Sequence, residues 1–321
     1  MYTLEENEKK QKYADILSLG GFNAFFGDEN NKAEVIKILN EFLPEHRKVA
    51  KIRLIPTNHA GPILNVSKEF RYDFMCQDES GAVFIVELQK YHEKPWFKRC
   101  VSYACRAYDK QNRAGRDYDV PPVYLIGLMG TAIDHPDKEL WKERYISEYT
   151  FMEKETHDLL GETIVIIFAE LGNFDKREEE CVTRRDRMLY MLKNSGKFDA
   201  PPVWSGKEEY DGILAALCID DYDDNKREKY ESDMKDERQL RSQLAAAQEI
   251  GEAKGREEGL KEGLEQGRKE GREEGREEGR EEGAKTKAIE IAQRMLEMGL
   301  PKDKVAEAAQ ITLAQLDALL A

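Results

Sequence analysis

Three residues, Asp73, Glu87 and Gln89, have the types and the spacing to hold a divalent cation. They lie within residues 70–89, where two apolar, β-prone runs flank a turn sequence at 78–81, and this pattern predicts a hairpin. Because strand side chains alternate between faces, Glu87 and Gln89 share one face, and Asp73 can lie opposite them on the first strand. A hard cation such as Mg²⁺ binds a few carboxylate oxygens and leaves its other positions to water and phosphate.

A purely structural interpretation of these acids stays open beside the metal site. An acid on a hairpin is commonly solvated or paired with a base. Residues 82–88 are almost continuously apolar, which is typical of a central strand covered on both faces. An ionised Glu87 in such a strand is costly unless it is paired or bound to a metal.

Length and composition restrict the class of protein. The 321 residues are enough for one large domain or two. The net charge of −14 argues against a broad basic surface for nucleic acid, although a bound metal would supply local positive charge. The five cysteines show no zinc-ligand spacing, and their odd number favours reduced thiols in a cytoplasmic protein. No apolar run approaches the roughly 20 residues that span a bilayer, so no membrane partner is expected.

The hydrophobic periodicity predicts an α/β core with helices packed on a mixed sheet. Residues 9–43 and 95–113 are predicted helices, the second beginning at Pro95. Residues 175–245 are expected to be mostly helical and strongly charged. Strands besides the hairpin are predicted at 49–56, 63–66, 123–129 and 164–170.

A glycine recurs at every fourth position from Gly251 to Gly283, nine in all, in a stretch with twelve Glu and eight Lys or Arg. On a helix these glycines wind around the axis because each repeat advances 40° beyond a full turn. Each glycine costs about 0.8–1 kcal/mol relative to alanine. We therefore expect a marginal helix or a flexible linker that self-association would stabilise.

Residues 284–321 form a predicted small helical module. Gly299 is the expected C-cap of its first helix, and Thr312 the expected N-cap of its last. The spacing resembles a helix-turn-helix, but residues 313–321 contain no Lys or Arg, and Gln315 alone supports DNA reading. The sequence favours oligomerisation or partner docking over DNA reading. Predicted domain boundaries are 1–235, 236–283 and 284–321.

The order of these blocks resembles the recombination-promoting nuclease and putative transposase family, Rpn, of the PD-(D/E)XK nuclease superfamily. The resemblance covers about residues 10–235, and the glycine repeat and C-terminal helices are also similar to those of the family. The matching stretches are 22–28, 31–32, 39–43, 72–74, 84–89, 97–99, Tyr103, Arg106, Tyr108, Gln111, 122–127 and 167–171.

The resemblance implies a restriction-endonuclease-like α/β fold and Mg²⁺-dependent cleavage of DNA, in recombination or mobile-element transposition. It implies that Asp73, Glu87 and the backbone carbonyl of Leu88 bind the metal, with Mn²⁺ as an alternative ion. Gln89 stands where the superfamily usually has a lysine that orients the attacking water; an amide can hydrogen-bond water but carries no charge.

Arg99 and Arg106, on the helix after the second strand, could offer positive charge to the DNA phosphate or the transition state. Surface salt bridges are the competing interpretation of both arginines.

One block departs from the family pattern. Relatives carry an acid and a lysine where this chain has Leu19 and Asn23. Asp15, Asp28 or Glu34 could take the place of the acid. The departure motivates a second hypothesis, a catalytically decayed nuclease-like scaffold for DNA or protein association. A third hypothesis is an oligomeric adaptor that assembles through the C-terminal region as a homo-oligomer.

Overall fold

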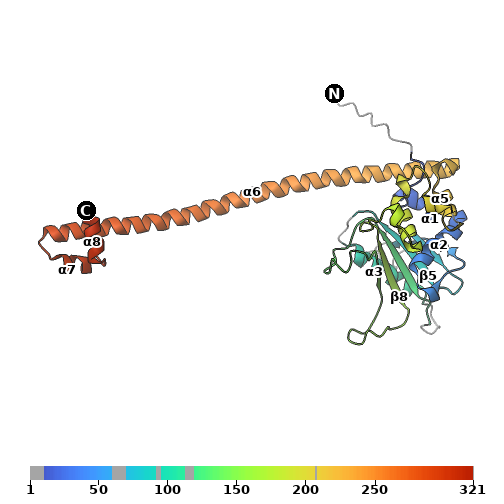
Figure 1. The fold of residues 1–321 in the computed structure, drawn as a ribbon, viewed down its shortest axis with the longest axis horizontal. Coiled ribbons are helices and arrows are strands. Elements are labelled where there is room, and N and C mark those ends of the chain that lie inside the picture. Colours follow the sequence, from blue (N-terminus) through green and yellow to red (C-terminus); the bar gives the residue numbers. More distant parts are fainter. Residues whose placement is uncertain (1–10, 60–69, 92–94, 113–118, 207, 321) are drawn as a thin grey trace, which may run out of the picture. The chain divides into compact units, whose positions relative to one another are not determined.

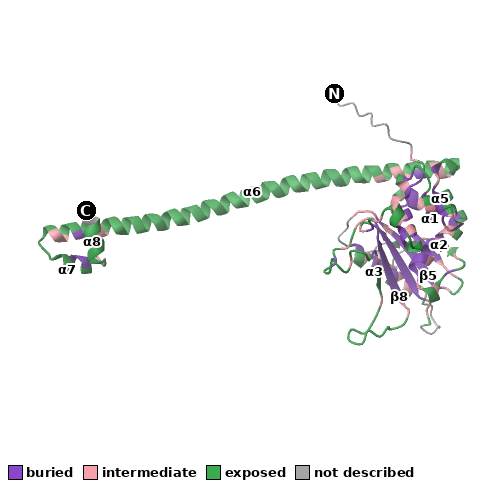
Figure 2. Cartoon of the chain, in the orientation of Figure 1, coloured by how far each residue is buried: buried purple, intermediate pink, exposed green. Residues whose placement is uncertain are grey.

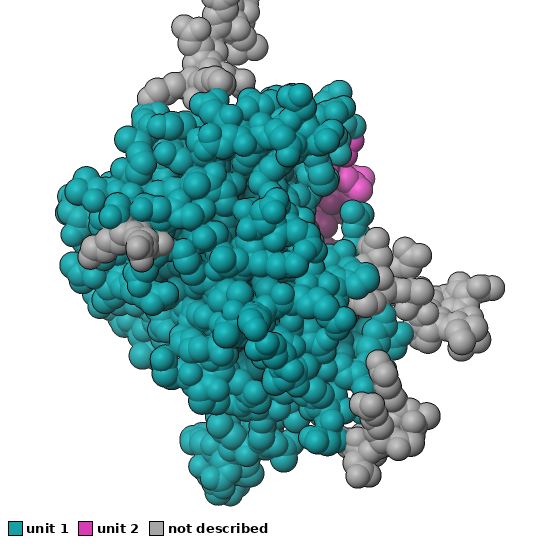
Figure 3. Space-filling view, turned by 90° about the vertical axis from the view of Figure 1, so that its right-hand side faces the viewer, with its two compact units in different colours: residues 1–241 teal, residues 242–321 magenta. Residues whose placement is uncertain are grey.

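The computed structural model describes residues 11–59, 70–91, 95–112, 119–206 and 208–320. The chain divides into two compact units, residues 1–241 and residues 242–321, which Figure 3 colours separately. The strand predicted at 63–66 lies outside the described residues.

The first unit is built on a mixed sheet whose described strands run in the order β1-β4-β5-β6-β8-β7 (Figure 1). The central strands β5, β6 and β8 are parallel, while β1, β4 and β7 pair antiparallel to their neighbours. The predicted α/β architecture and the predicted hairpin of β4 and β5 are therefore confirmed. The strands of this sheet are β1 (Arg53–Leu54), β4 (Phe74–Gln77), β5 (Val83–Gln89), β6 (Val123–Met129), β7 (Ile146–Tyr149) and β8 (Ile164–Glu170). A separate antiparallel pair joins β2 (Asn58–His59) to β3 (Phe70–Arg71).

Helices cover both faces of the sheet and bury its core (Figure 2). On one face, Val83 and Ile85 of β5 pack in a cluster with Trp96 and Cys100 of helix α3. On the other face, the alternate residues of β5 pack with four helices. The helix on the first face is α3 (Trp96–Asp109), and those on the second are α1 (Leu19–Phe26), α2 (Lys32–Phe42), α4 (Arg184–Asn194) and α5 (Glu208–Leu217).

The helical character predicted over residues 9–43 is confirmed for two helices, α1 and α2, which are separated by a break, whereas the described residues ahead of Ser18 are not helical. The Ser18 hydroxyl accepts the Gly21 N–H at 3.0 Å and starts α1, and the Asp28 carboxylate accepts the Asn30 N–H in a short turn before α2. Such side chains compete with the helix for backbone partners. Ahead of α1, Tyr13 forms an isolated bridge with Cys218, the Ala14 N–H donates to the Leu217 carbonyl, and the Ser18 N–H closes a turn on the Asp15 carbonyl.

Two other segments differ in detail from the sequence expectation. The strand predicted over 49–56 is only β1, and the edge strand β7 was not predicted. The predicted helical region 175–245 contains α4, α5 and the start of α6, joined by short 3₁₀ turns. The 3₁₀ segments of the chain are Glu29–Asn31, Glu45–Arg47, Glu178–Glu180, Ser195–Lys197, Val203–Ser205 and Ile219–Asp221.

A 74-residue helix, α6 (Asp224–Glu297), begins in the first unit and continues into the second. Residues 242–283 of α6 are exposed throughout (Figure 2). Of the two alternatives that the glycine repeat left open, the structure shows a helix. A Cβ added at any glycine from Gly251 to Gly283 would meet nothing within 4 Å, so these glycines accommodate no close neighbour within the chain.

The predicted C-terminal helical module consists of the end of α6, α7 (Lys302–Ala308) and α8 (Leu313–Leu320). Ala292, Val305, Ala306 and Leu316 form its small core. Gly299, with φ of +80°, ends α6 as the sequence predicts. Among the described residues, no helix combines the length and the apolar character that crossing a bilayer requires.

The caps of α8 explain the role of Gln315. Thr312 Oγ1 accepts the Gln315 N–H at 3.2 Å, and Gln315 Oε1 accepts the Thr312 N–H at 2.9 Å. This reciprocal capping box begins α8 as predicted. The amide that alone supported DNA reading is therefore used to start a helix.

Candidate active site

The hairpin brings Asp73 and Glu87 together at the point where β4 begins. Phe74 pairs with Val86 in the antiparallel register, which places Asp73 opposite Glu87. The Asp73 N–H donates to Glu87 Oε1 at 3.2 Å, and the Leu88 N–H donates to Asp73 Oδ2 at 2.9 Å. Each carboxylate is thus fixed by the backbone of the other strand.

Glu87 is an acid in an unfavourable position. Its side chain lies on the α3 face of β5, in the row of Val83 and Ile85, and the residue is only 2% exposed. Burial and the negative charge of Asp73 raise its pKa to about 9, outweighing the Asp73 N–H and the Arg99 charge, which lower it. A positive ion beside both carboxylates would reverse this shift because it favours the ionised forms.

The donor set fits a hard cation with few protein ligands. Across the described part of the chain, no three or more His, Cys, Asp or Glu side chains gather as a metal site. Two carboxylates with a backbone carbonyl suit Mg²⁺, which retains several waters and binds through one or two carboxylates. A zinc site, with four side-chain ligands, does not fit these residues.

Gln89 shares the face of Glu87, as predicted, but its amide is directed to protein partners. It is 4% exposed. Its Oε1 accepts a hydrogen bond from Arg99 Nη2 at 3.0 Å, and its Nε2 donates to the Tyr91 carbonyl. Gln89 therefore connects the end of β5 to an arginine of α3.

Arg99 also packs on the ring of Trp96, and Gly127 leaves the space that this ring occupies. Its guanidinium carbon lies 4.9 Å from the centre of the Trp96 ring. Gly127 of β6, the register partner of Glu87, leaves room for that ring. A Cβ at Gly127 would come within 2.7 Å of Phe168 Cδ1 and 3.1 Å of Trp96 Cζ2.

Arg106 lies two turns further along α3 than Arg99. It forms a weak ion pair with Asp109 at 3.4 Å. Between the arginines, Tyr103 packs edge-on against Tyr72, with 5.0 Å between ring centres. The structure thus places Arg99 with Gln89 and near the carboxylates, and leaves Arg106 farther along the same helix.

The departures at Leu19 and Asn23 are accompanied by acids from α6 that sequence reasoning missed. The Leu19 N–H donates to Glu237 Oε2 at 2.7 Å, and Asn23 Nδ2 donates to Asp233 Oδ2 at 2.9 Å. A third acid, Asp236, lines two neighbouring hollows, one of about 900 Å³ that includes Asp73 and one of about 260 Å³ that includes Gln89 and Arg99. Contacts over some 210 positions leave no local signal in a sequence.

The three acids considered as substitutes for the missing one each have a cationic partner. Asp28, which lines the larger hollow with Asp73, pairs with Lys226 at 2.7 Å. Asp15 lies 3.4 Å from Lys90, and Glu34 lies 2.9 Å from Lys37. Lys90 follows Gln89 but also binds Glu237 at 2.6 Å, and both residues line the smaller hollow with Arg99.

A mixed sheet with paired acids on its central hairpin, covered by helices on both faces, defines a nuclease-type α/β fold. The model of the PD-(D/E)XK nuclease family transposases matches residues 21–247, which contain all of the candidate site. The chain therefore belongs to the PD-(D/E)XK nuclease family of transposases. Comparisons with curated proteins and with solved structures gave no match.

Proposed function

We propose that this protein is a Mg²⁺-dependent DNA endonuclease that hydrolyses phosphodiesters in recombination or mobile-element transposition. Family membership supports the reaction class. The observation that carries the proposal is the pairing of buried Glu87 with Asp73, each held by the other strand's backbone. Because burial and the Asp73 charge raise the Glu87 pKa to about 9, a cation beside the pair would favour the ionised form of both acids near neutral pH.

In this proposal Asp73, Glu87 and the Leu88 carbonyl hold the metal. When bound, Mg²⁺ or Mn²⁺ would lower the pKa of a coordinated water and offset charge on the phosphate. The protein's own contribution is to hold two carboxylates in fixed positions through N–H donors from the opposite strand. That fixed geometry removes the need to reorganise the site during the reaction.

The contacts support a positioning role for Gln89. Its carbonyl oxygen holds Arg99, and the Trp96 ring supports the same guanidinium. Arg99 would donate hydrogen bonds to a phosphate oxygen, which a planar guanidinium does well. The pair would then provide the positive charge that a lysine at position 89 supplies elsewhere in the superfamily. Arg106 would contact DNA farther from the reacting phosphate.

The second candidate function is a decayed, nuclease-like scaffold for association with DNA or protein. It is favoured by Leu19, whose side chain offers no acid, and by Asn23, whose amide donates to Asp233 where relatives carry a lysine. Homo-oligomerisation through the C-terminal region also stays a prediction, and gel filtration with mass measurement of the full chain and of a chain that lacks residues 246–321 would test it.

The decisive experiment is plasmid cleavage in Mg²⁺ and in EDTA. Wild-type protein should nick or cut DNA only with the metal, and the Asp73→Ala and Glu87→Ala variants should be inactive while folded. Glu79→Ala, at an exposed turn acid of the same hairpin, is the matched control and should cleave normally.

Calorimetric titration with Mg²⁺ and Mn²⁺ separates the two functions. Metal binding that both site variants abolish supports the endonuclease. DNA retention without metal binding or cleavage supports the scaffold. Cleavage that survives in both Asp73→Ala and Glu87→Ala removes the proposed site.

A further inference from the structure

A second cluster of interacting polar residues lies at the carboxyl end of β8, and the proposed reaction does not use it. Glu170, the last residue of β8, is completely buried. Its carboxylate accepts the Ile133 N–H at 2.9 Å, bonds His135 Nε2 at 2.8 Å and accepts the Asn173 amide at 3.3 Å. One buried acid thus fixes the loop that follows β6 against the loop that follows β8.

Aromatic stacking makes the first of these loops more rigid. The His135 ring lies parallel to the Trp141 ring, with 3.6 Å between their centres. The Arg144 guanidinium covers Trp141 as well, at 4.7 Å. The loop after β6 is therefore held by Glu170 at one end and by a stacked aromatic pair along its length.

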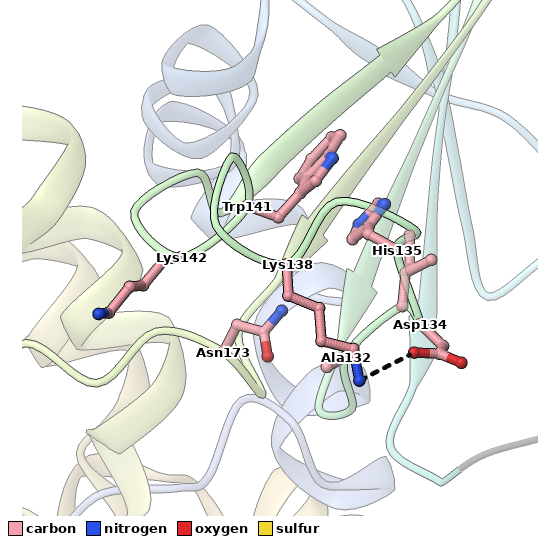
Figure 4. Close-up of a pocket in the computed structure, with 8 residues that line it drawn as sticks. Ala132, Asp134, His135, Lys138, Trp141, Lys142 and Asn173 are labelled. Atoms are coloured by element: carbon pink, nitrogen blue, oxygen red, sulfur yellow. Dashed lines mark ion pairs between the residues drawn. The ribbon is translucent and has the colours of Figure 1, made fainter.

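The two loops enclose a pocket of about 440 Å³ whose lining is rich in N–H donors (Figure 4). Lys138 and Lys142 come from the loop after β6, together with His135, and Asn173 comes from the loop after β8. Asp134 is the one carboxylate among the described lining residues, and it lies 3.7 Å from Lys138 in a highly exposed ion pair. The described lining thus holds two lysines and one carboxylate, while Asp137, Glu139 and Glu143 belong to the same loop outside the lining, so the two lysines are the groups that would meet an anion.

The pocket and the candidate active site both lie at the carboxyl ends of the parallel strands. Gln89, Met129 and Glu170 are register partners at the ends of the parallel strands β5, β6 and β8. Ligands of open α/β sheets bind at this edge.

We propose that the Lys138–Lys142 pocket binds a backbone phosphate of the DNA strand, away from the phosphate cleaved at Asp73 and Glu87. The proposal rests on the proposed function, because it assumes that DNA lies across this edge of the sheet. The two lysines recognise the anion, while Glu170 acts through His135 and the loop as a positioning residue.

The test measures binding without cleavage, by fluorescence anisotropy of a labelled duplex in EDTA over a series of salt concentrations. The Lys138→Ala/Lys142→Ala double variant should bind more weakly than wild type, and its slope of log affinity against log salt should be smaller by about one. The matched control is Lys51→Ala/Lys154→Ala. It removes the same charge from exposed positions beyond the amino-terminal ends of the parallel strands. Its affinity should lie close to that of wild type.

Two further measurements separate this proposal from the proposed function. Glu87→Ala should lose cleavage yet keep the difference between the two lysine pairs. Inorganic phosphate should change the fluorescence of Trp141, identified by comparison with Trp141→Phe, and the pocket variant should lose that response. Equal affinities and salt slopes for the two lysine pairs would overturn the proposal. If wild type binds no duplex, the function on DNA fails, and the phosphate titration then decides whether the pocket binds an anion.

Discussion

Arg99 on α3 donates a hydrogen bond from Nη2 to Oε1 of Gln89 at the end of β5, over 3.0 Å. The bond joins a neutral amide, at the position where the superfamily usually has a lysine, to a cation from another element. The positive charge on this side of the site is therefore supplied by Arg99 of α3.

The first prediction concerns that pair. Gln89→Ala and Arg99→Ala should each lower cleavage, roughly 10- to 100-fold, because a hydrogen bond to a charged group is worth about 1.5–3 kcal/mol. The double variant should be little worse than Arg99→Ala, since both changes remove one interaction. Cleavage kinetics of the four proteins give the coupling.

A rescue experiment strengthens this cycle. Gln89→Lys introduced into Arg99→Ala should recover part of the lost activity because it restores a cation near the carboxylates. Fully additive losses, with no rescue, would contradict a shared role for Gln89 and Arg99.

The second prediction is a pH dependence of stability without metal. The Glu87 pKa is raised from 4.5 to about 9 on folding, so between these values the folded state keeps a proton that the unfolded state has lost. Stability contributed by this group is complete below pH 4.5 and falls as pH rises toward 9. Thermal melts in EDTA should show Glu87→Gln equal to wild type near pH 5 and more stable near pH 8. A wild type that is the more stable protein at pH 8 would contradict the shift.

The third prediction links metal binding to protons. A metal binds the ionised carboxylate, so binding must release the proton held by Glu87. Mg²⁺ affinity should rise by up to about tenfold per pH unit below the Glu87 pKa. Calorimetry in buffers of different ionisation enthalpy counts the released protons, and an affinity that is flat between about pH 6 and pH 8 would exclude Glu87 as a ligand.

The fourth prediction concerns packing behind the site. Gly127→Ala should destabilise the protein by about 1–3 kcal/mol, because its methyl group would overlap the rings of Phe168 and Trp96. Displacement of Trp96 should also disturb Arg99 and lower cleavage. Denaturant unfolding measures the first effect. Gly206→Ala is the control, since a Cβ there meets nothing within 4 Å.

The fifth prediction concerns the glycine repeat of α6. Replacing Gly271, Gly275 and Gly279 by alanine should stabilise the helix by about 0.8–1 kcal/mol per site, because each position is open. Circular dichroism of the full chain during heating measures the change. Loss of helix or of a homo-oligomer in the triple variant would mean instead that the glycines accommodate another chain closely.

The parts of the fold with strong local patterns could be predicted from the sequence. The apolar runs of β5, β6 and β8 indicate buried strands, and side-chain alternation in the hairpin places Glu87 and Gln89 on one face. β7 was missed because its four residues lie at the sheet edge and are only partly buried, which leaves no clear period. The start of a helical stretch near Asp28 could be predicted, whereas the cap that Ser18 provides for α1 was not recognised within the surrounding helical pattern.

The surroundings of the candidate site were much less predictable. Asp233 and Glu237 reach Asn23 and Leu19 from positions more than 200 residues away, and nothing in a charged helix indicates which acids turn inward. The link from Gln89 to Arg99 also depends on the tilt of α3 over the sheet. Motif spacing identifies the paired acids, whereas the packing of the helices determines their neighbours.

The contacts of Glu237 limit how segments of this chain can be exchanged between relatives. This residue binds the Leu19 N–H at the start of α1 and Lys90 after the end of β5. It belongs to α6, the helix that continues into residues 242–321. A chimera that exchanged tails at residue 235 would separate these partners, leaving Lys90 with a foreign neighbour. The N-terminal block and the first turns of α6 should therefore be exchanged, and evolve, as a matched pair.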